Sequence, residues 1–398
     1  MILSKNLNHL GTETAFAVSN EAKTISQSGE KIYPFHLGDI NIETPMSIRE
    51  ATIRYMNDNK NGYCPSEGVV RLREMLAYDI GRKRNVNYEI DNVIIQPGGK
   101  PTIWKFLATV MNRGDEVLYP DPGYPIYESQ IRYQGGVPIP YGYVDTGSGF
   151  KIEIDKLISS ITPKTTALIY NNYQNPVSAS SSKEEIELLA KLCIENDLWV
   201  LSDDAYYEIR YSDTPPLSIV AIPGMRERTV ILYTFSKRFA MTGWRIGASV
   251  GPKKIMKQIT RLNINDESCT NHFIQCALAD TLNDIDVEAK AILSELEGRR
   301  DLSVKYFNAI AGVSLPIPDS TFYLFINITK LMYNKGYDDL EQFRIDALNS
   351  TGVSFCTRNH FGTPQANEKL KYIRLAYSGI NENDIKEGLT KFKNWVEN

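Results

Sequence analysis

Short runs of β-branched and aromatic residues alternate with helical patterns through the middle of this sequence, and this alternation most strongly constrains its fold. The clearest helical pattern spans 182–196 and follows a candidate N-cap at Ser181 or Ser182. Ile186 and Leu189 begin its series of apolar residues at helical spacing. Strands that alternate with helices indicate a mostly parallel sheet with helices on both faces. The predicted strands are 92–96, 116–119, 137–143, 166–171, 198–203, 229–235 and 245–251.

The C-terminal part of the sequence predicts a second, smaller α+β unit. It begins with one long helix, which also offers the connection between the two units because no Gly/Ser-rich linker is present. The predicted elements are a helix at 287–310, strands at 322–328, 353–356 and 372–376, and a helix at 382–396.

Length and composition exclude several classes of protein. A chain of 398 residues is long enough for two or more domains. Acidic residues outnumber basic ones by 48 to 44, which disfavours nucleic-acid binding, and no apolar run approaches the roughly 20 residues that span a bilayer. We find no signal-peptide pattern, and the five cysteines show no CxxC spacing. We therefore expect a cytoplasmic protein with reduced thiols and neither a metal site nor a membrane partner.

Residues just after the strands are candidates for ligand binding, because parallel sheets bind ligands beyond the carboxyl ends of their strands. The first predicted strand runs into Gly98-Gly99-Lys100-Pro101 and then into a helical pattern. A glycine turn that leads into a helix presents free backbone N–H groups to an anion. Taken alone, the same residues also fit a turn with no binding role.

Two further strand ends carry charged side chains. Asp203 follows an apolar strand, where a buried carboxylate is a counter-charge for a bound cation or, alternatively, a helix cap. Lys237 follows the apolar run VILYTF, where a lysine is suited to form a Schiff base unless it simply lies on a surface loop. Arg245 and the hydroxyls of Thr234 and Ser236 are candidate phosphate ligands.

A Schiff-base lysine, a carboxylate, a tyrosine and a phosphate site together are what pyridoxal 5′-phosphate (PLP) requires. The chain resembles the class I/II, fold-type I PLP-dependent aminotransferases, and most closely their aspartate aminotransferase branch. The resemblance runs from about residue 38 to residue 374. The matching motifs are 234–247 (TFSK…TGWRIG) with SxSK…GWRxG, 202–206 (SDDAY) with SDExY, 171–176 (NNYQNP) with NxPxNP, and 63–74 with Yx…G…LRE.

The resemblance implies a role for each matched residue. Lys237 is the Schiff-base lysine and the base that moves the substrate proton, and Asp203 pairs with the pyridine nitrogen. Asn175 and Tyr206 hydrogen-bond the phenolic oxygen of the cofactor. Tyr124 stacks on its ring.

The phosphate and substrate ligands follow in the same way. The implied phosphate ligands are Arg245, Ser236, Thr234 and the backbone N–H groups of Gly99 and Lys100. Tyr63 reaches the phosphate of a neighbouring subunit, which implies a homodimer. Arg374 binds the substrate α-carboxylate as a bidentate guanidinium, and the backbone of Gly38 approaches the same group.

The implied fold is fold type I. It has a large domain at 46–290, with a mostly parallel seven-stranded sheet between helices, and a small α+β domain made of 1–45 with 291–398. The family's NPTG is here Asn175-Pro176-Val177-Ser178, and the usual proline after Gly38 is absent.

The implied reaction moves the amino group of an L-amino acid, with aspartate as the first choice, to a 2-oxo acid such as 2-oxoglutarate by a ping-pong mechanism. Arg358 is the first candidate to bind a side-chain carboxylate and Lys105 the second, although either can be structural. Two alternatives remain open. One is another fold-type I reaction, such as C–S β-elimination or cyclopropane formation, and the other is a non-catalytic PLP-binding module.

Overall fold

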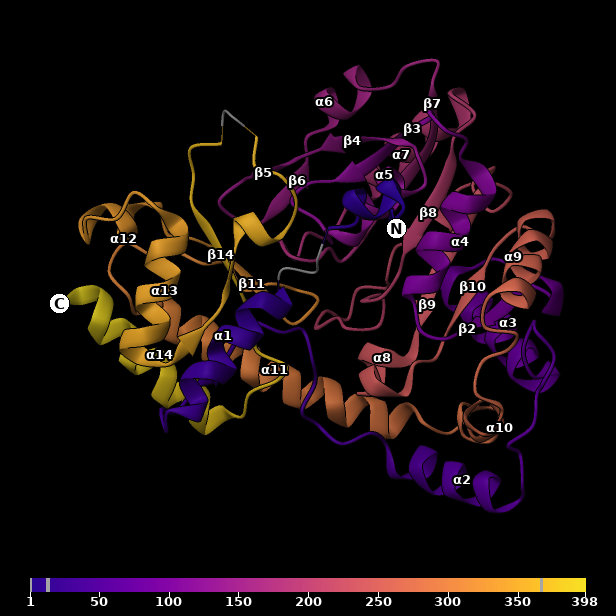
Figure 1. Ribbon diagram of the computed structural model, residues 1–398, viewed down its shortest axis with the longest axis horizontal. Coiled ribbons are helices and arrows are strands. Elements are labelled where there is room, and N and C mark those ends of the chain that lie inside the picture. The colour runs from indigo at the N-terminus through magenta and orange to yellow at the C-terminus, as the bar shows by residue number, and fades with distance from the viewer. Residues whose placement is uncertain (1, 12–14, 366–367) are drawn as a thin grey trace.

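The computed structural model describes residues 2–11, 15–365 and 368–398 and contains the seven-stranded sheet that the sequence predicts (Figure 1). Six strands are parallel, and β10 runs antiparallel to both of its neighbours. From one edge to the other, the strands are β2 (Val93–Gln96), β10 (Gly247–Val250), β9 (Thr229–Thr234), β8 (Trp199–Asp203), β7 (Thr165–Tyr170), β3 (Glu116–Pro120) and β4 (Val137–Tyr141).

Consecutive residues of the central strands enter two separate hydrophobic cores, one on each face of the sheet. Ile95 and Val200 belong to one core, and Ile94 and Leu201 belong to the other. This alternation follows from the two-residue period of a strand. The first core includes α3 (Val70–Arg84), α7 (Lys183–Glu195) and α10 (His272–Thr281), and the second includes α4 (Lys100–Val110), α5 (Ile126–Tyr133) and α9 (Lys253–Asn265). The predicted fold class is therefore confirmed.

A second group of elements surrounds a three-stranded sheet with its own core. Its strands are β11 (Tyr323–Asn327), β14 (Tyr372–Ala376) and β13 (Cys356–Thr357). Its helices are α11 (Asp286–Asn308), α12 (Thr329–Asn334), α13 (Leu340–Thr351) and α14 (Glu382–Glu397). Figure 1 shows α11 running from beside α8 to this group, as expected for a connecting helix.

Most of the N-terminal segment packs with the C-terminal group, whereas the 3₁₀ helix at Lys5–His9 contacts α5 of the large sheet. β1 (Tyr33–Pro34) pairs in parallel with β12 (Val353–Ser354), and Tyr33 and Phe35 lie in the core of the three-stranded sheet. In Figure 1, α1 (Ala15–Gln27) lies beside the C-terminal helices. Arg344 of α13 forms an ion pair with Glu21 of α1 at 2.7 Å.

The remaining helices and strands are shorter or lie outside these two sheets. They are α2 (Met46–Asn57), β5 (Tyr143–Asp145), β6 (Phe150–Ile152), α6 (Ile154–Ser159), α8 (Phe235–Arg238) and the 3₁₀ helices at Lys5–His9, Ile90–Asn92, Ile219–Ala221, Thr242–Trp244 and Arg358–His360. Among the described residues, no helix has the length and apolar character needed to cross a membrane.

Most predicted strands differ from the structure by one or two residues at their ends, and in three of them the difference has an identifiable cause. The run 137–143 divides at Gly142 into β4 and the start of the β5–β6 hairpin. The run 353–356 divides at Phe355, so that β12 pairs with β1 whereas β13 pairs with β14. The run 229–235 ends at Thr234, because the hydroxyl of Thr234 accepts a hydrogen bond from the Ser236 N–H and begins α8.

Ser182, one of the two predicted N-caps, begins α7. Its hydroxyl accepts a hydrogen bond from the Glu185 N–H at 3.2 Å, and the Glu185 carboxylate accepts the Ser182 N–H at 2.9 Å. This is a capping box, which satisfies two N–H groups at the helix start.

We expect Ser182→Ala to lower the free energy of unfolding by about 1 kcal/mol, because it removes this cap. Ser182→Asp supplies another acceptor at the same position and should retain most of the stability. Urea unfolding of the two variants beside the unmodified protein measures the difference. Equal losses in both variants would show that the hydroxyl is not acting as a cap.

Candidate functional site

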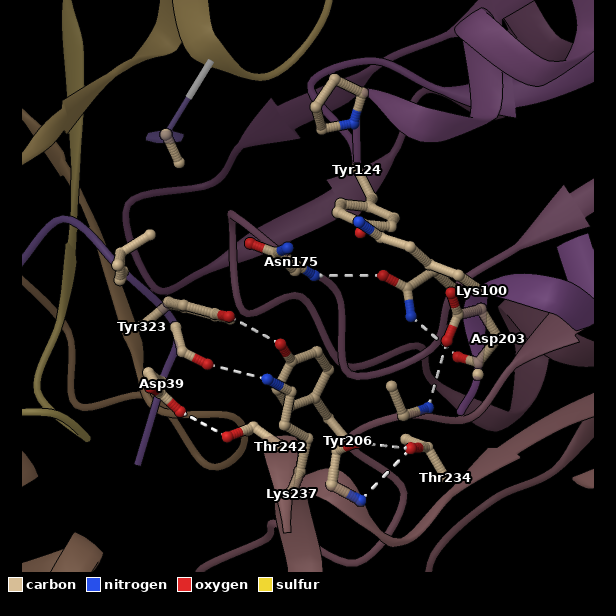
Figure 2. A pocket seen from close by; sticks show the side chains of 18 of the residues that line it. Asp39, Lys100, Tyr124, Asn175, Asp203, Tyr206, Thr234, Lys237, Thr242 and Tyr323 are labelled. Carbon is tan, nitrogen blue, oxygen red and sulfur yellow. Dashed lines mark hydrogen bonds between the residues drawn. The ribbon is translucent and has the colours of Figure 1, made fainter. Parts of the chain in front are cut away.

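A cavity of about 610 Å³ lies at the carboxyl ends of the central strands and brings together nearly all the site residues predicted from the sequence (Figure 2). The large sheet and its loops, the N-terminal segment and the three-stranded sheet all contribute to its lining. The predicted residues that line it are Gly38, Gly99, Lys100, Tyr124, Asn175, Asp203, Tyr206, Thr234, Ser236, Lys237, Arg245 and Arg374.

Asp203 is a buried carboxylate at the end of β8. Burial raises its pKa to about 6, although a hydrogen bond from the Tyr127 hydroxyl at 2.6 Å acts in the opposite direction. The Ala205 N–H also donates to this carboxylate, at 3.2 Å. A buried carboxylate with a raised pKa is stabilised by a cationic partner, so this part of the cavity suits a positively charged ring N–H.

Side chains that the sequence analysis missed hold Asp203 in place. Tyr127 follows Tyr124 by three residues in the loop and first turn of α5, and both side chains line the cavity. The adjacent Asp204 is tied to the buried Arg84, whose Nε and Nη2 donate to one carboxylate oxygen at 2.9 and 2.7 Å. With Asp204 fixed outside the cavity lining, Asp203 is the carboxylate presented to the cavity.

The start of α4 and the loop after β9 bring together groups that are suited to bind an anion. The helix begins at Lys100, after Gly99, so the first N–H groups have no carbonyl partner within the helix. The hydroxyls of Thr234 and Ser236 are 2.9 Å apart and line the same cavity. Arg245 lies so close to Gly98 that an added Cβ would be 2.2 Å from its guanidinium.

Lys237 and Tyr206 occupy the centre of the cavity. Lys237 Nζ donates to the Gly38 carbonyl at 2.7 Å, and the hydroxyls of Tyr206 and Tyr323 share a hydrogen bond of 2.6 Å (Figure 2). Burial raises the pKa of Tyr206 well above its ordinary value, so this phenol is neutral at physiological pH. The sequence analysis missed Tyr323, which is the second residue of a predicted strand and lies in no matched motif.

Arg374 lies on β14 between two rings. Its Cζ is 4.5 Å from the Tyr323 ring centroid and 4.6 Å from that of Phe361. Nη1 donates to the Asn175 side chain at 3.2 Å and Nη2 to the His36 carbonyl at 2.5 Å, whereas the buried Nε has no hydrogen-bond partner among the described residues. A guanidinium in this arrangement is suited to bind a carboxylate in the cavity.

Three residues singled out in the sequence lie outside the cavity lining. Tyr63 is 88% exposed and points away from its own chain. Arg358 is buried in an ion pair with Asp121. Lys105, on α4, is buried and donates to Gln96 and Asn263 at 3.0 and 2.7 Å. Neither cation faces the space in which a substrate side chain would lie.

Comparisons with known proteins assign the family. A family model described as aminotransferase class I and II matches residues 31–392. The chain is 28% identical to an aspartate aminotransferase of Bacillus subtilis, covering 100% of this chain and 99% of the relative. It is 30% identical to a probable aspartate/prephenate aminotransferase of Rhizobium leguminosarum, covering 90% and 92%. The solved aspartate aminotransferase of Thermus thermophilus with maleate has a TM-score of 0.89 at 25% identity, covering 99% of each chain.

The raised pKa of Asp203 predicts that the ligand-free protein loses folding stability as this carboxyl group ionises. An unfolded aspartate has a pKa of about 3.9, so the folded state binds the proton more tightly and its stability falls as pH rises towards the folded value of about 6. Asp203→Asn removes this cost and should stabilise the ligand-free protein at pH 8 by on the order of 2 kcal/mol.

Urea unfolding at pH 5 and pH 8 tests this prediction, and the gain should be smaller at pH 5. Asp213→Asn, on an exposed loop, is the matched control and should change stability equally at both values. A destabilised Asp203→Asn protein at pH 8 would contradict the prediction.

Proposed function

This chain belongs to the class I and II aminotransferases, and we propose that it uses pyridoxal 5′-phosphate to transfer the amino group of L-aspartate to a 2-oxo acid such as 2-oxoglutarate. One observation carries the proposal. A single cavity contains Lys237, a buried carboxylate at Asp203, an anion site at the start of α4, and Arg374. These groups come from four separate parts of the chain.

The cavity fits this cofactor by the chemistry of its donors. Asp203 would accept a hydrogen bond from the protonated pyridine nitrogen. This contact would stabilise the ionised carboxylate, whose burial raises its pKa. The phosphate would be bound by the N–H groups of Gly99 and Lys100, the hydroxyls of Thr234 and Ser236, and Arg245. Gly98 leaves room for Arg245, because an added Cβ would collide with the guanidinium.

When bound, PLP supplies an aldehyde carbon that bonds to amines and a pyridinium ring that withdraws electrons from the substrate α-carbon. Lys237 Nζ would bind the cofactor covalently and then, once displaced, accept and return the α-proton. Asp203 keeps the ring nitrogen protonated. Tyr206 and Asn175 would donate hydrogen bonds to the phenolic oxygen, and Tyr124 would cover one face of the ring.

Arg374 would bind the α-carboxylate of the substrate. Its buried Nε is a donor without a partner among the described residues, and the rings of Tyr323 and Phe361 restrict the guanidinium to one plane. The backbone at Gly38 would lie beside the same carboxylate. An added Cβ at Gly38 would be 2.1 Å from the Tyr323 hydroxyl, so only glycine fits there without displacing that phenol.

Aspartate carries a second carboxylate, and the Lys100 side chain would bind it. Lys100 lines the cavity, with Nζ 5.7 Å from the Tyr124 ring centroid, whereas the two cations first considered for this role do not line it. The names of the relatives support a dicarboxylate donor, since both curated relatives described above include aspartate.

The active protein would be a cytoplasmic homodimer that acts in amino acid metabolism. Tyr63 is exposed in one chain, so it would contact a cofactor phosphate only in a partner subunit. Each chain would divide into a large domain at 46–290 and a small domain of 1–45 with 291–398. Two observations support this division. The three-stranded sheet has a core apart from that of the large sheet, and β1 pairs with β12.

Lys237→Ala should abolish covalent attachment of the cofactor. Borohydride reduction followed by peptide mass mapping should find the reduced cofactor on Lys237 of the unmodified protein and on no peptide of the variant. Lys105→Met, which changes a lysine outside the cavity, is the control and should keep the label. Labelling of the Lys237→Ala protein would overturn the assignment of this lysine.

Lys100→Met should raise the KM for aspartate by on the order of tenfold, because it removes one charge-assisted contact. The KM for alanine, which has no second carboxylate, should change little. Steady-state transfer from each amino acid to 2-oxoglutarate gives both KM values. Parallel losses for the two amino acids would place Lys100 in cofactor binding only.

A further inference from the structure

Arg358 and Asp121 form a buried ion pair between the two sheets. Nη2 of Arg358 lies 2.7 Å from a carboxylate oxygen of Asp121, and the side chains are 4% and 1% exposed. Asp121 follows β3 of the large sheet, whereas Arg358 follows β13 of the small one. The same guanidinium also binds both oxygens of Glu368, at 3.0 and 2.8 Å.

The two segments fit closely around this pair. The Phe361 carbonyl accepts the Gly123 N–H at 3.0 Å and Arg358 Nη1 at 3.1 Å, so one oxygen joins both segments. Gly362 has a φ of 108°, and a Cβ at this position would be 2.4 Å from the Asp121 carboxylate. A side chain at Gly362 would separate the two segments.

Each joined segment carries a wall of the cavity. The 358–362 segment holds Phe361 against the Arg374 guanidinium, and the 121–124 turn ends in Tyr124. Movement of either segment would change the distance between the ring stacked on the cofactor and the group that binds the substrate carboxylate. The ion pair itself touches neither ligand, because neither of its members lines the cavity.

We propose that Arg358 and Asp121 are positioning residues: their ion pair fastens the Phe361 segment to the Tyr124 turn and thereby sets the substrate carboxylate site against the cofactor site. This inference rests on the proposed function for its kinetic consequence. Its structural part, the attachment of one segment to the other, does not depend on any ligand.

Single and double variants separate the effect of the ion pair on substrate binding from its effect on thermal stability. Arg358→Met and Asp121→Asn each remove one charge, and we expect each to raise the amino acid KM by on the order of tenfold, with the cofactor still bound. Each single variant should also unfold at a lower temperature, because one buried charge loses its partner. In the Asp121→Asn/Arg358→Met double variant, no charge remains unpaired within the pair, so thermal stability should recover. Its KM should stay high.

Amide hydrogen exchange of the holoenzyme supplies a readout besides activity. The Gly123 N–H donates to the Phe361 carbonyl, and we expect its exchange to be faster in both single variants and in the double variant. Glu368→Gln is the matched control, because it removes the other carboxylate on Arg358 and leaves the Asp121 contact in place. That control should keep the KM and the exchange rate of the unmodified protein.

The proposal is wrong if the double variant recovers its KM together with its stability, since the pair would then be structural only. It is also wrong if Gly123 exchanges at the same rate in all proteins. An unmodified protein that transfers no amino group contradicts the proposed function instead, and the exchange experiment still decides whether the ion pair fastens the two segments.

Discussion

The burial of the Asp203 carboxylate is the constraint on which the rest of this site depends. A carboxylate in an apolar interior is costly, and among the described residues the Tyr127 hydroxyl and the Ala205 N–H donate hydrogen bonds to it. Its fixed position relies on the adjacent Asp204, which is paired with the buried Arg84. The protein therefore maintains one paired and one incompletely satisfied carboxylate side by side. Such an arrangement is expected where a cationic ligand completes the site.

Sequence predicts the large sheet well, because each of its strands is a short apolar run that ends at polar residues. It predicts the cavity for the same reason. Parallel strands end at one edge of the sheet, so Gly99, Asp203 and Lys237 had to meet there. The errors occur where tertiary contacts override the local pattern. Phe355 interrupts a run that would otherwise be continuous, because β12 and β13 pair with different partners.

Two site residues were missed for a second reason. Tyr323 and Phe361 lie far along the chain from the cofactor motifs, and only the packing of the small sheet against the large one brings them into the cavity. The role of Arg358 could not be decided from the sequence for a related reason. A loop arginine near a substrate site is equally suited to bind a substrate carboxylate or a protein carboxylate, and nothing in the local sequence shows that Asp121 lies 2.7 Å away.

The site is therefore divided between two parts of the molecule, the large sheet with its helices and the three-stranded sheet with its helices, which are called the two bodies here. The large sheet supplies the groups suited to a cofactor, and the small sheet supplies Arg374, Tyr323 and Phe361. Because the site is divided, the packing inside either body fixes few of its polar contacts. The contacts between the two bodies therefore determine the geometry of the site. The Phe361 carbonyl shared by Gly123 and Arg358 and the Tyr206–Tyr323 hydrogen bond are two such contacts. Because both join a substrate-binding segment to a cofactor-binding segment, the alignment of the two ligands depends on how the bodies meet.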